Sequence, residues 1–175
     1  SLAPVSTYGA SKLAGEALIR SYCYMFDMRG YAFRFGNVVG PRQTHGVGFD
    51  FVKRLLDNPK ELRILGDGRQ SKSYVHVSDI AEAHLLALEY LLAGGKSSAV
   101  NLANARGHSV KEVIAAAERV CGRKIAAEAS PRRPGDPPSL VGSADLAREL
   151  LGWQPSRSQL DVQIADAWRW FKQRR

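Results

Sequence analysis

Helix-like and strand-like patterns alternate along this chain. In residues 11–28 apolar side chains recur every three or four positions, which is typical of an amphipathic helix. Residues 31–35 follow as a short aromatic run between glycines, which is typical of a strand. Further strands are predicted at 62–65, 74–77, 99–102 and 124–128, and further helices at 49–56, 79–92, 110–121, 144–151 and 160–172. We therefore predict an alternating α/β fold.

Local signals mark several element boundaries. Ser78 and Asp79 form a pair suited to capping the helix that follows the strand at 74–77. Ser109 with Glu112 three residues later matches a capping box. Gly66-Asp67-Gly68 predicts a turn between strands, because no third glycine follows at Ser71 to complete a dinucleotide fingerprint.

Composition narrows the class of protein. The 175 residues, 45% of them hydrophobic, are enough for one globular domain or for one domain with a small second lobe. Cys23 and Cys121 lack a CxxC spacing and the four histidines lack ligand spacing, so we expect no disulfide framework and no metal. No apolar run reaches the roughly 20 residues that span a membrane. We expect a cytoplasmic protein.

The net charge of +8 leaves two kinds of ligand open. Most Lys and Arg residues are scattered, apart from Arg132-Arg133 and the terminal Arg174-Arg175. No basic stripe with interleaved aromatic residues and no RNA-binding motif is present, so nucleic acid is not expected. A small substrate that carries phosphate explains the charge equally well.

Tyr8 and Lys12 are candidate catalytic residues. Four residues apart on a helix, their side chains share one face about 6 Å apart along the axis. A phenol is a poor base at neutral pH, but a neighbouring cation stabilises its phenolate form. By itself, Tyr-x-x-x-Lys also fits an ordinary surface pair.

The residues around this pair extend the argument to a family. The segment PVSTYGASKLAGE at 4–16 resembles the active-site helix of the extended short-chain dehydrogenases. Four more segments are similar to that family in order and spacing: RFGNVVGPR at 34–42, ILGDGRQSKSYVHVSDIAEAHLLAL at 64–88, VNLAN at 100–104 and PRRPGDPP at 131–138. The chain is thereby identified as a member of the NAD-dependent epimerase/dehydratase family, over essentially its whole length. The resemblance is strongest to epimerases that interconvert UDP-glucose and UDP-galactose.

The resemblance implies roles for particular residues. Tyr8 would take the proton from the sugar O4 as hydride leaves C4 for NAD, and Lys12 would hold the nicotinamide ribose. Phe35 and Gly36 would lie beside the nicotinamide, and Asn37 would hydrogen-bond the substrate diphosphate. From the residues alone, Asn37 could instead be a loop asparagine that tolerates a positive φ.

Four more positions concern the substrate. Arg133 resembles the arginine that clamps its phosphates and Asp136 the acid that binds the nucleoside ribose, although Arg133 could also be a solvated loop residue. Lys72 stands where many members have a second phosphate-binding arginine, and Leu140 where some epimerases have a tyrosine. Lysine keeps the positive charge but loses the bidentate fork.

The resemblance also implies how the chain is divided. Its fold would be the C-terminal part of a Rossmann-type extended short-chain dehydrogenase with a small α/β substrate-binding lobe. Residues 1–45 would end the NAD-binding domain, and 46–175 would form mainly the nucleotide-sugar lobe, with 74–104 returning to the NAD-binding domain. The sequence contains no glycine-rich NAD loop, so we expect this chain to be inactive by itself. In relatives the Tyr/Lys helix packs at a dimer interface, so the resemblance also implies a homodimer.

Two alternatives to an epimerase stay open. Nucleotide-sugar 4,6-dehydratases and decarboxylases share the Tyr/Lys helix and the initial oxidation at C4. The chain could also be a non-catalytic module that binds a nucleotide sugar.

Overall fold

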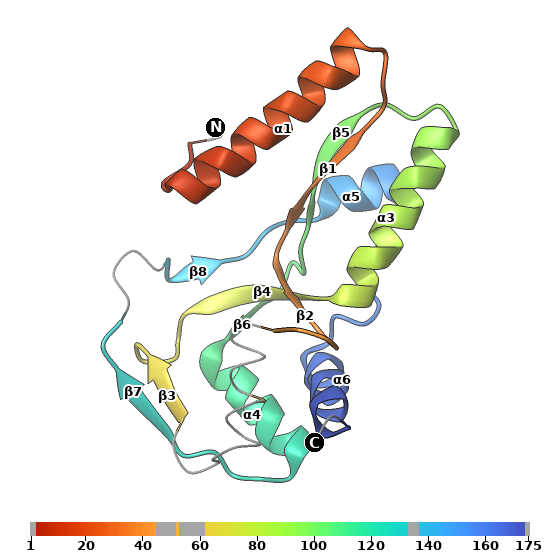
Figure 1. Ribbon diagram of the computed structural model, residues 1–175. Helices are drawn as coiled ribbons and strands as arrows, with labels where there is room; N and C mark the ends of the chain where they lie inside the picture. The colour runs from red at the N-terminus through yellow and green to blue at the C-terminus, as the bar shows by residue number, and fades with distance from the viewer. Residues whose placement is uncertain (1–2, 45–51, 53–61, 133–136, 174–175) are drawn as a thin grey trace.

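The computed structural model describes residues 3–44, 52, 62–132 and 137–173, and its helices and strands alternate as predicted (Figure 1). The predicted helix at 49–56 lies outside these residues apart from Val52. In chain order the elements are α1 (Thr7–Met25), β1 (Tyr31–Phe35), β2 (Asn37–Val39), β3 (Leu62–Leu65), β4 (Ser71–His76), α3 (Val77–Leu92), β5 (Ser98–Leu102), β6 (Gly107–Ser109), α4 (Val110–Cys121), β7 (Ala127–Ser130), β8 (Ser139–Leu140), α5 (Asp145–Leu151) and α6 (Leu160–Lys172).

The first helix starts earlier than its apolar pattern predicts. Ser6 has an extended backbone, and its side chain accepts a hydrogen bond of 3.0 Å from the Gly9 amide. This N-cap satisfies a backbone donor that the first turn leaves unpaired, so α1 begins at Thr7 rather than at residue 11. As a result Tyr8 and Lys12 both lie within regular helix.

Three sets of paired strands run through the described part of the chain. β1 pairs in parallel with β5, and β3 pairs in parallel with β7. β4 pairs with β2 and β8 in parallel and with β6 in antiparallel orientation. The sequence did not predict β2, β6 and β8, because strands of two or three residues carry too little pattern and form only where β4 offers a partner.

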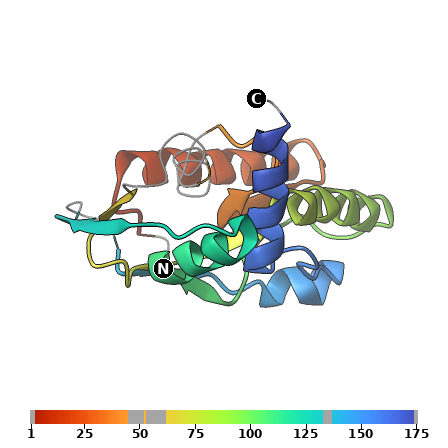
Figure 2. The same cartoon turned by 90° about the horizontal axis from the view of Figure 1, so that it is seen from below.

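Helices cover these strands in two separate cores. α1 lies on one side of the β1 and β5 pair and α5 on the other (Figures 1 and 2). One core joins α3, α5 and β5 and includes Leu102, Ala83 and Trp153, while the other joins β3, β4, α4 and α6. Within the described ranges, no helix combines the length and the apolar character that crossing a membrane requires.

A buried aspartate connects the start of α3 to the segment before α6. Asp79 is only 1% exposed, and its carboxylate accepts hydrogen bonds from the Arg157 amide at 3.1 Å and the Ser158 hydroxyl at 2.5 Å. The Trp153 indole donates to the Asp79 carbonyl at 2.8 Å. Asp79 thus holds the start of α3 against the segment before α6. The predicted Ser78–Asp79 cap is wrong, because the N-cap of α3 is His76.

We expect Asp79→Ala to destabilise the domain by about 3 kcal/mol or more, because it leaves buried donors of the Arg157 and Ser158 region without acceptors. Denaturant unfolding of the purified chain measures this loss. Glu82→Ala, an exposed change on the same helix, is the control and should stay within about 0.5 kcal/mol of the unchanged chain. A small effect of Asp79→Ala would contradict the role of Asp79 as an anchor.

His76 sits at the same junction as a buried neutral group. Its Nδ1 accepts a hydrogen bond of 3.2 Å from the Ser78 amide, and its Nε2 lies 3.4 Å from a carboxylate oxygen of Asp166. Burial lowers the pKa of His76 below its usual 6.5, and the nearby Asp166 only partly offsets this effect. His76 therefore binds a proton less readily in the folded chain than in the unfolded chain.

This difference predicts a pH dependence of stability. As pH falls below about 6.5, the unfolded chain takes up a proton on His76 before the folded chain does, so the free energy of unfolding decreases. His76→Asn keeps an acceptor for the Ser78 amide but cannot be protonated. Between pH 7 and pH 5 we expect the unchanged chain to lose more thermal stability than this variant, and an equal loss in both would contradict the explanation.

Candidate functional site

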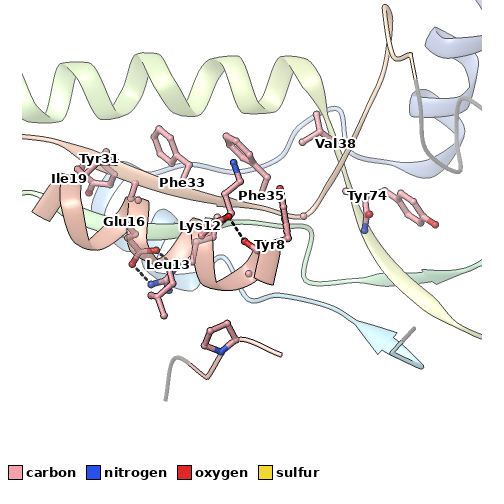
Figure 3. A pocket seen from close by; sticks show the side chains of 18 of the residues that line it. Tyr8, Lys12, Leu13, Glu16, Ile19, Tyr31, Phe33, Phe35, Val38 and Tyr74 are labelled. Carbon is pink, nitrogen blue, oxygen red and sulfur yellow. Dashed lines mark hydrogen bonds and ion pairs between the residues drawn. The ribbon is translucent and has the colours of Figure 1, made fainter. Parts of the chain in front are cut away.

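A groove of about 1390 Å³ opens between α1, β1 and the start of β2 (Figure 3). Its α1 wall includes Tyr8, Lys12 and Glu16, which follow one another at intervals of four residues on one face of the helix. Its other wall includes Phe35 and Asn37. These five polar or aromatic side chains therefore line one groove.

Tyr8 and Lys12 lie together in this groove, as their spacing predicts. The Lys12 ammonium nitrogen is 5.4 Å from the centroid of the Tyr8 ring. The Tyr8 side chain is 71% exposed, so its hydroxyl is accessible to a ligand. A phenol and an ammonium group therefore face the same open space and can act on one bound molecule.

The two faces of β1 differ in chemistry. Phe33 and Phe35 project toward α3, where the His84 ring lies 4.7 Å and 6.2 Å from their ring centroids (Figure 3). Phe35 remains 51% exposed and offers a planar apolar surface at the end of the strand. Arg34 projects from the opposite face and binds Glu16 of α1.

Gly36 and Asn37 occupy the point where the chain changes its strand partner. The Gly36 amide donates to the Leu102 carbonyl at 2.9 Å, and the Asn37 side-chain amide donates to the Ser73 carbonyl at 3.0 Å. Asn37 belongs to β2, so the alternative of a loop asparagine with positive φ is wrong. Its hydrogen bond uses one of two amide hydrogens, and the second can serve a ligand.

Tyr31 and Tyr74 also line the groove, and Tyr74 differs from Tyr8 in its surroundings. Tyr74 is buried, and this burial raises the pKa of Tyr74 to about 12. Its side chain therefore stays a neutral phenol at physiological pH. Between Tyr8 and Tyr74, exposure favours Tyr8 as the residue that exchanges a proton with a ligand.

The remaining predicted substrate residues are not all in this groove. Lys72 lies on β4, opposite Leu140 of β8 and His108 of β6, and does not line the groove. Arg133 and Asp136 lie outside the residues that the structure describes. The structure therefore brings together Tyr8, Lys12, Phe35, Gly36 and Asn37.

Two groove residues, Glu16 and Arg34, were not singled out from the sequence. A signal for both was present: Glu16 continues the four-residue spacing of Tyr8 and Lys12, and Arg34 is the one charged residue in the aromatic run 31–35. Strand alternation places Arg34 on the face opposite Phe33 and Phe35. Only the packing of α1 against β1 reveals that the two charges meet.

Comparison with known proteins agrees with this geometry. The UDP-glucose 4-epimerase of Lacticaseibacillus casei is 38% identical over 97% of this chain, and that of Azospirillum brasilense is 39% identical over 95%. The Thermotoga maritima UDP-glucose 4-epimerase structure with UDP-glucose superimposes with a TM-score of 0.90, at 28% identity over 98% of the chain. The Stenotrophomonas maltophila UDP-glucose 4-epimerase structure, with bound NAD and formylated UDP-arabinopyranose, gives a TM-score of 0.87 at 29% identity, again over 98%.

These relatives are longer than this chain. It spans 56% and 53% of the two curated sequences, and 55% and 56% of the two structures. The sequence model of one family, described as the NAD dependent epimerase/dehydratase family, matches residues 1–103, which include every described groove residue named above. With its α/β fold and its Tyr8 and Lys12 groove, the chain belongs to the NAD dependent epimerase/dehydratase family.

Proposed function

We propose that this chain is the substrate-side part of an NAD-dependent nucleotide-sugar 4-epimerase, acting on UDP-glucose and UDP-galactose. One observation carries the proposal: the Tyr8 phenol and the Lys12 ammonium share an open groove with Asn37, at the end of β1. The names of the relatives support the choice of UDP-hexoses, because both curated sequences compared above are UDP-glucose 4-epimerases.

Within this proposal Tyr8 is the general base. Its phenolate would take the proton of the sugar O4 hydroxyl while C4 gives up a hydride to NAD, so that the C4–O bond becomes a ketone. Lys12 stabilises the phenolate electrostatically from its position beside the ring. After the ketone turns its other face, hydride would return from NAD to that face of C4 and set the opposite configuration, and Tyr8 would return the proton to O4.

NAD would supply the hydride chemistry at C4, and the described residues offer groups for one end of it. Lys12 supplies a cationic donor for hydroxyl groups of the nicotinamide ribose, and the exposed Phe35 ring offers an apolar surface for the nicotinamide beside Gly36. The 175 residues contain no glycine-rich loop for the pyrophosphate. We therefore expect weak NAD binding and no turnover by the 175-residue chain tested alone.

The proposed division into domains has some support in the strand pairing. β5 lies in the range 74–104 and pairs in parallel with β1, which lies in the range 1–45. This pairing supports a return of 74–104 to the NAD-binding domain. The remainder of 46–175 would carry the nucleotide-sugar residues Lys72, Arg133 and Asp136.

Isothermal titration of the purified chain with UDP-glucose, UDP-galactose and NAD tests the proposal. We expect UDP-sugar binding that Arg133→Ala weakens by about tenfold or more, because a hydrogen bond to a charged phosphate contributes about 1.5–3 kcal/mol. Arg123→Ala removes an exposed arginine after α4 and is the matched control.

Each outcome of this titration has a clear meaning. Loss of binding in Arg133→Ala but not in Arg123→Ala supports a phosphate clamp at residue 133. Absence of UDP-sugar binding by the unchanged chain would overturn the proposed substrate. Epimerisation of UDP-galactose by the chain alone would contradict the expected inactivity.

A homodimer is the proposed assembly, and α1 is its proposed surface. Leu18, Tyr22 and Met25 form an apolar stripe on α1, and all three side chains are exposed. Light scattering should give twice the chain mass of 19.2 kDa for the unchanged chain, and the single-chain mass for Leu18→Lys/Met25→Lys. Leu88→Lys, at an exposed leucine of α3, should leave the dimer intact. A monomeric unchanged chain would rule the proposal out.

A further inference from the structure

An ion pair joins the middle of α1 to β1 beside the Tyr8 and Lys12 pair. The Arg34 Nε donates to one Glu16 carboxylate oxygen at 2.9 Å, and its Nη2 donates to the other (Figure 3). The guanidinium fork therefore engages both oxygens of Glu16. Neither residue has a part in the proton transfer proposed above.

The position of Glu16 on the helix allows it to interact with Lys12. Glu16 lies four residues after Lys12, on the same face and about 6 Å along the helix axis. A carboxylate and an ammonium at this spacing attract each other. If Glu16 were not engaged by Arg34, it would compete with the Tyr8 ring for the Lys12 side chain.

Glu16 carries a full negative charge in this setting. The hydrogen bonds from Arg34 lower the pKa of Glu16 below its usual value, and the charge of Arg20 adds a smaller effect in the same direction. The carboxylate is therefore ionised at neutral pH. Both of its oxygens are engaged by Arg34 of β1.

The helix offers little else that would fix these side chains. α1 buries none of its side chains in the described structure, although it runs alongside β1 over several turns. Arg34 and Glu16 connect the two elements midway along the helix, one turn from Lys12. The ion pair is thus well placed to set both the electrostatics and the orientation of the Lys12 side chain.

We propose that Arg34 is a positioning residue of the active site, which holds Glu16 so that Lys12 remains beside Tyr8. This inference rests on the proposed function, in which Lys12 must serve the phenolate and the ribose. Arg34 acts only through Glu16 and Lys12 and does not contact the reacting atoms.

Nuclear magnetic resonance of the isotope-labelled chain provides a direct test. Lys12 methylene protons near the Tyr8 ring are displaced in chemical shift by the ring current, and Tyr8→Leu supplies the undisplaced reference. In Arg34→Gln we expect the ratio of Lys12 conformers near the ring to those away from it to fall by about 1.5- to 2-fold, the effect of one helical ion pair at this spacing.

Removing the competing carboxylate should reverse this effect. Glu16→Gln/Arg34→Gln removes the carboxylate four residues from Lys12, so we expect the ring-current displacement of the unchanged chain to return. Glu16→Gln alone should also leave the displacement in place. Arg20→Gln is the matched control, since it removes a neighbouring arginine of α1 and leaves the fork between Arg34 and Glu16 intact.

These variants separate positioning from a general loss of structure. The proposal would be overturned if Arg34→Gln left the ring-current displacement of Lys12 unchanged. It would also be overturned if the displacement in the double variant were as small as in Arg34→Gln. Circular dichroism confirms that each variant is folded. The spectra use no nucleotide and no turnover, so a failure of the proposed function appears in the titration with UDP-sugars and not in this experiment.

Discussion

The site depends on one change of strand partner, at Gly36. Before this residue β1 pairs with β5, and after it β2 pairs with β4, so the same short segment belongs to two sets of strands. The Gly36 amide completes the first set through Leu102, and the Asn37 side chain joins the second through Ser73. Because the backbone is held on both sides, Phe35 and Asn37 emerge at one fixed place at the end of β1.

The opposite wall of the groove is held in a different way. Tyr8 and Lys12 lie on a helix that buries no side chain in the described part of the chain, so the packing of a core does not fix them. Helical spacing sets their relation to each other, and the contact between Glu16 and Arg34 connects their helix to β1. A strand end held by hydrogen bonds on both sides thus faces a helix that an ion pair connects to β1.

Elsewhere, buried polar side chains connect helices and strands through hydrogen bonds. Asp79 joins α3 to the Ser158 region, and the Gln163 side chain donates to the Tyr74 and Ser158 carbonyls. Both side chains are nearly excluded from water, and a buried polar group without a hydrogen-bond partner lowers stability. Such groups define how the C-terminal helix packs beneath β4, and they keep that strand in place behind the groove.

Sequence patterns predicted the elements that carry strong local signals. The strand at 31–35, the capping box of Ser109 and Glu112, and the helix at 160–172 were all confirmed, because capping groups and apolar periodicity act over a few residues. The same patterns could not show that His76 rather than Ser78 caps α3, since that choice depends on where β4 ends. For the site, the segment similarity and the four-residue spacing indicated Tyr8 and Lys12, and the roles of Arg133 and Asp136 stay predictions.

The sequence by itself thus determined the α/β class, the family and the side chains of the α1 face, since these follow from local spacing and from motifs along the chain. The tertiary structure decided which distant residues meet: Arg34 with Glu16, Asn37 with Ser73, and Asp79 with Ser158. Such contacts join residues 18 to 79 positions apart. Their formation depends on strand pairing and on the burial of polar groups, which no local pattern of residues specifies.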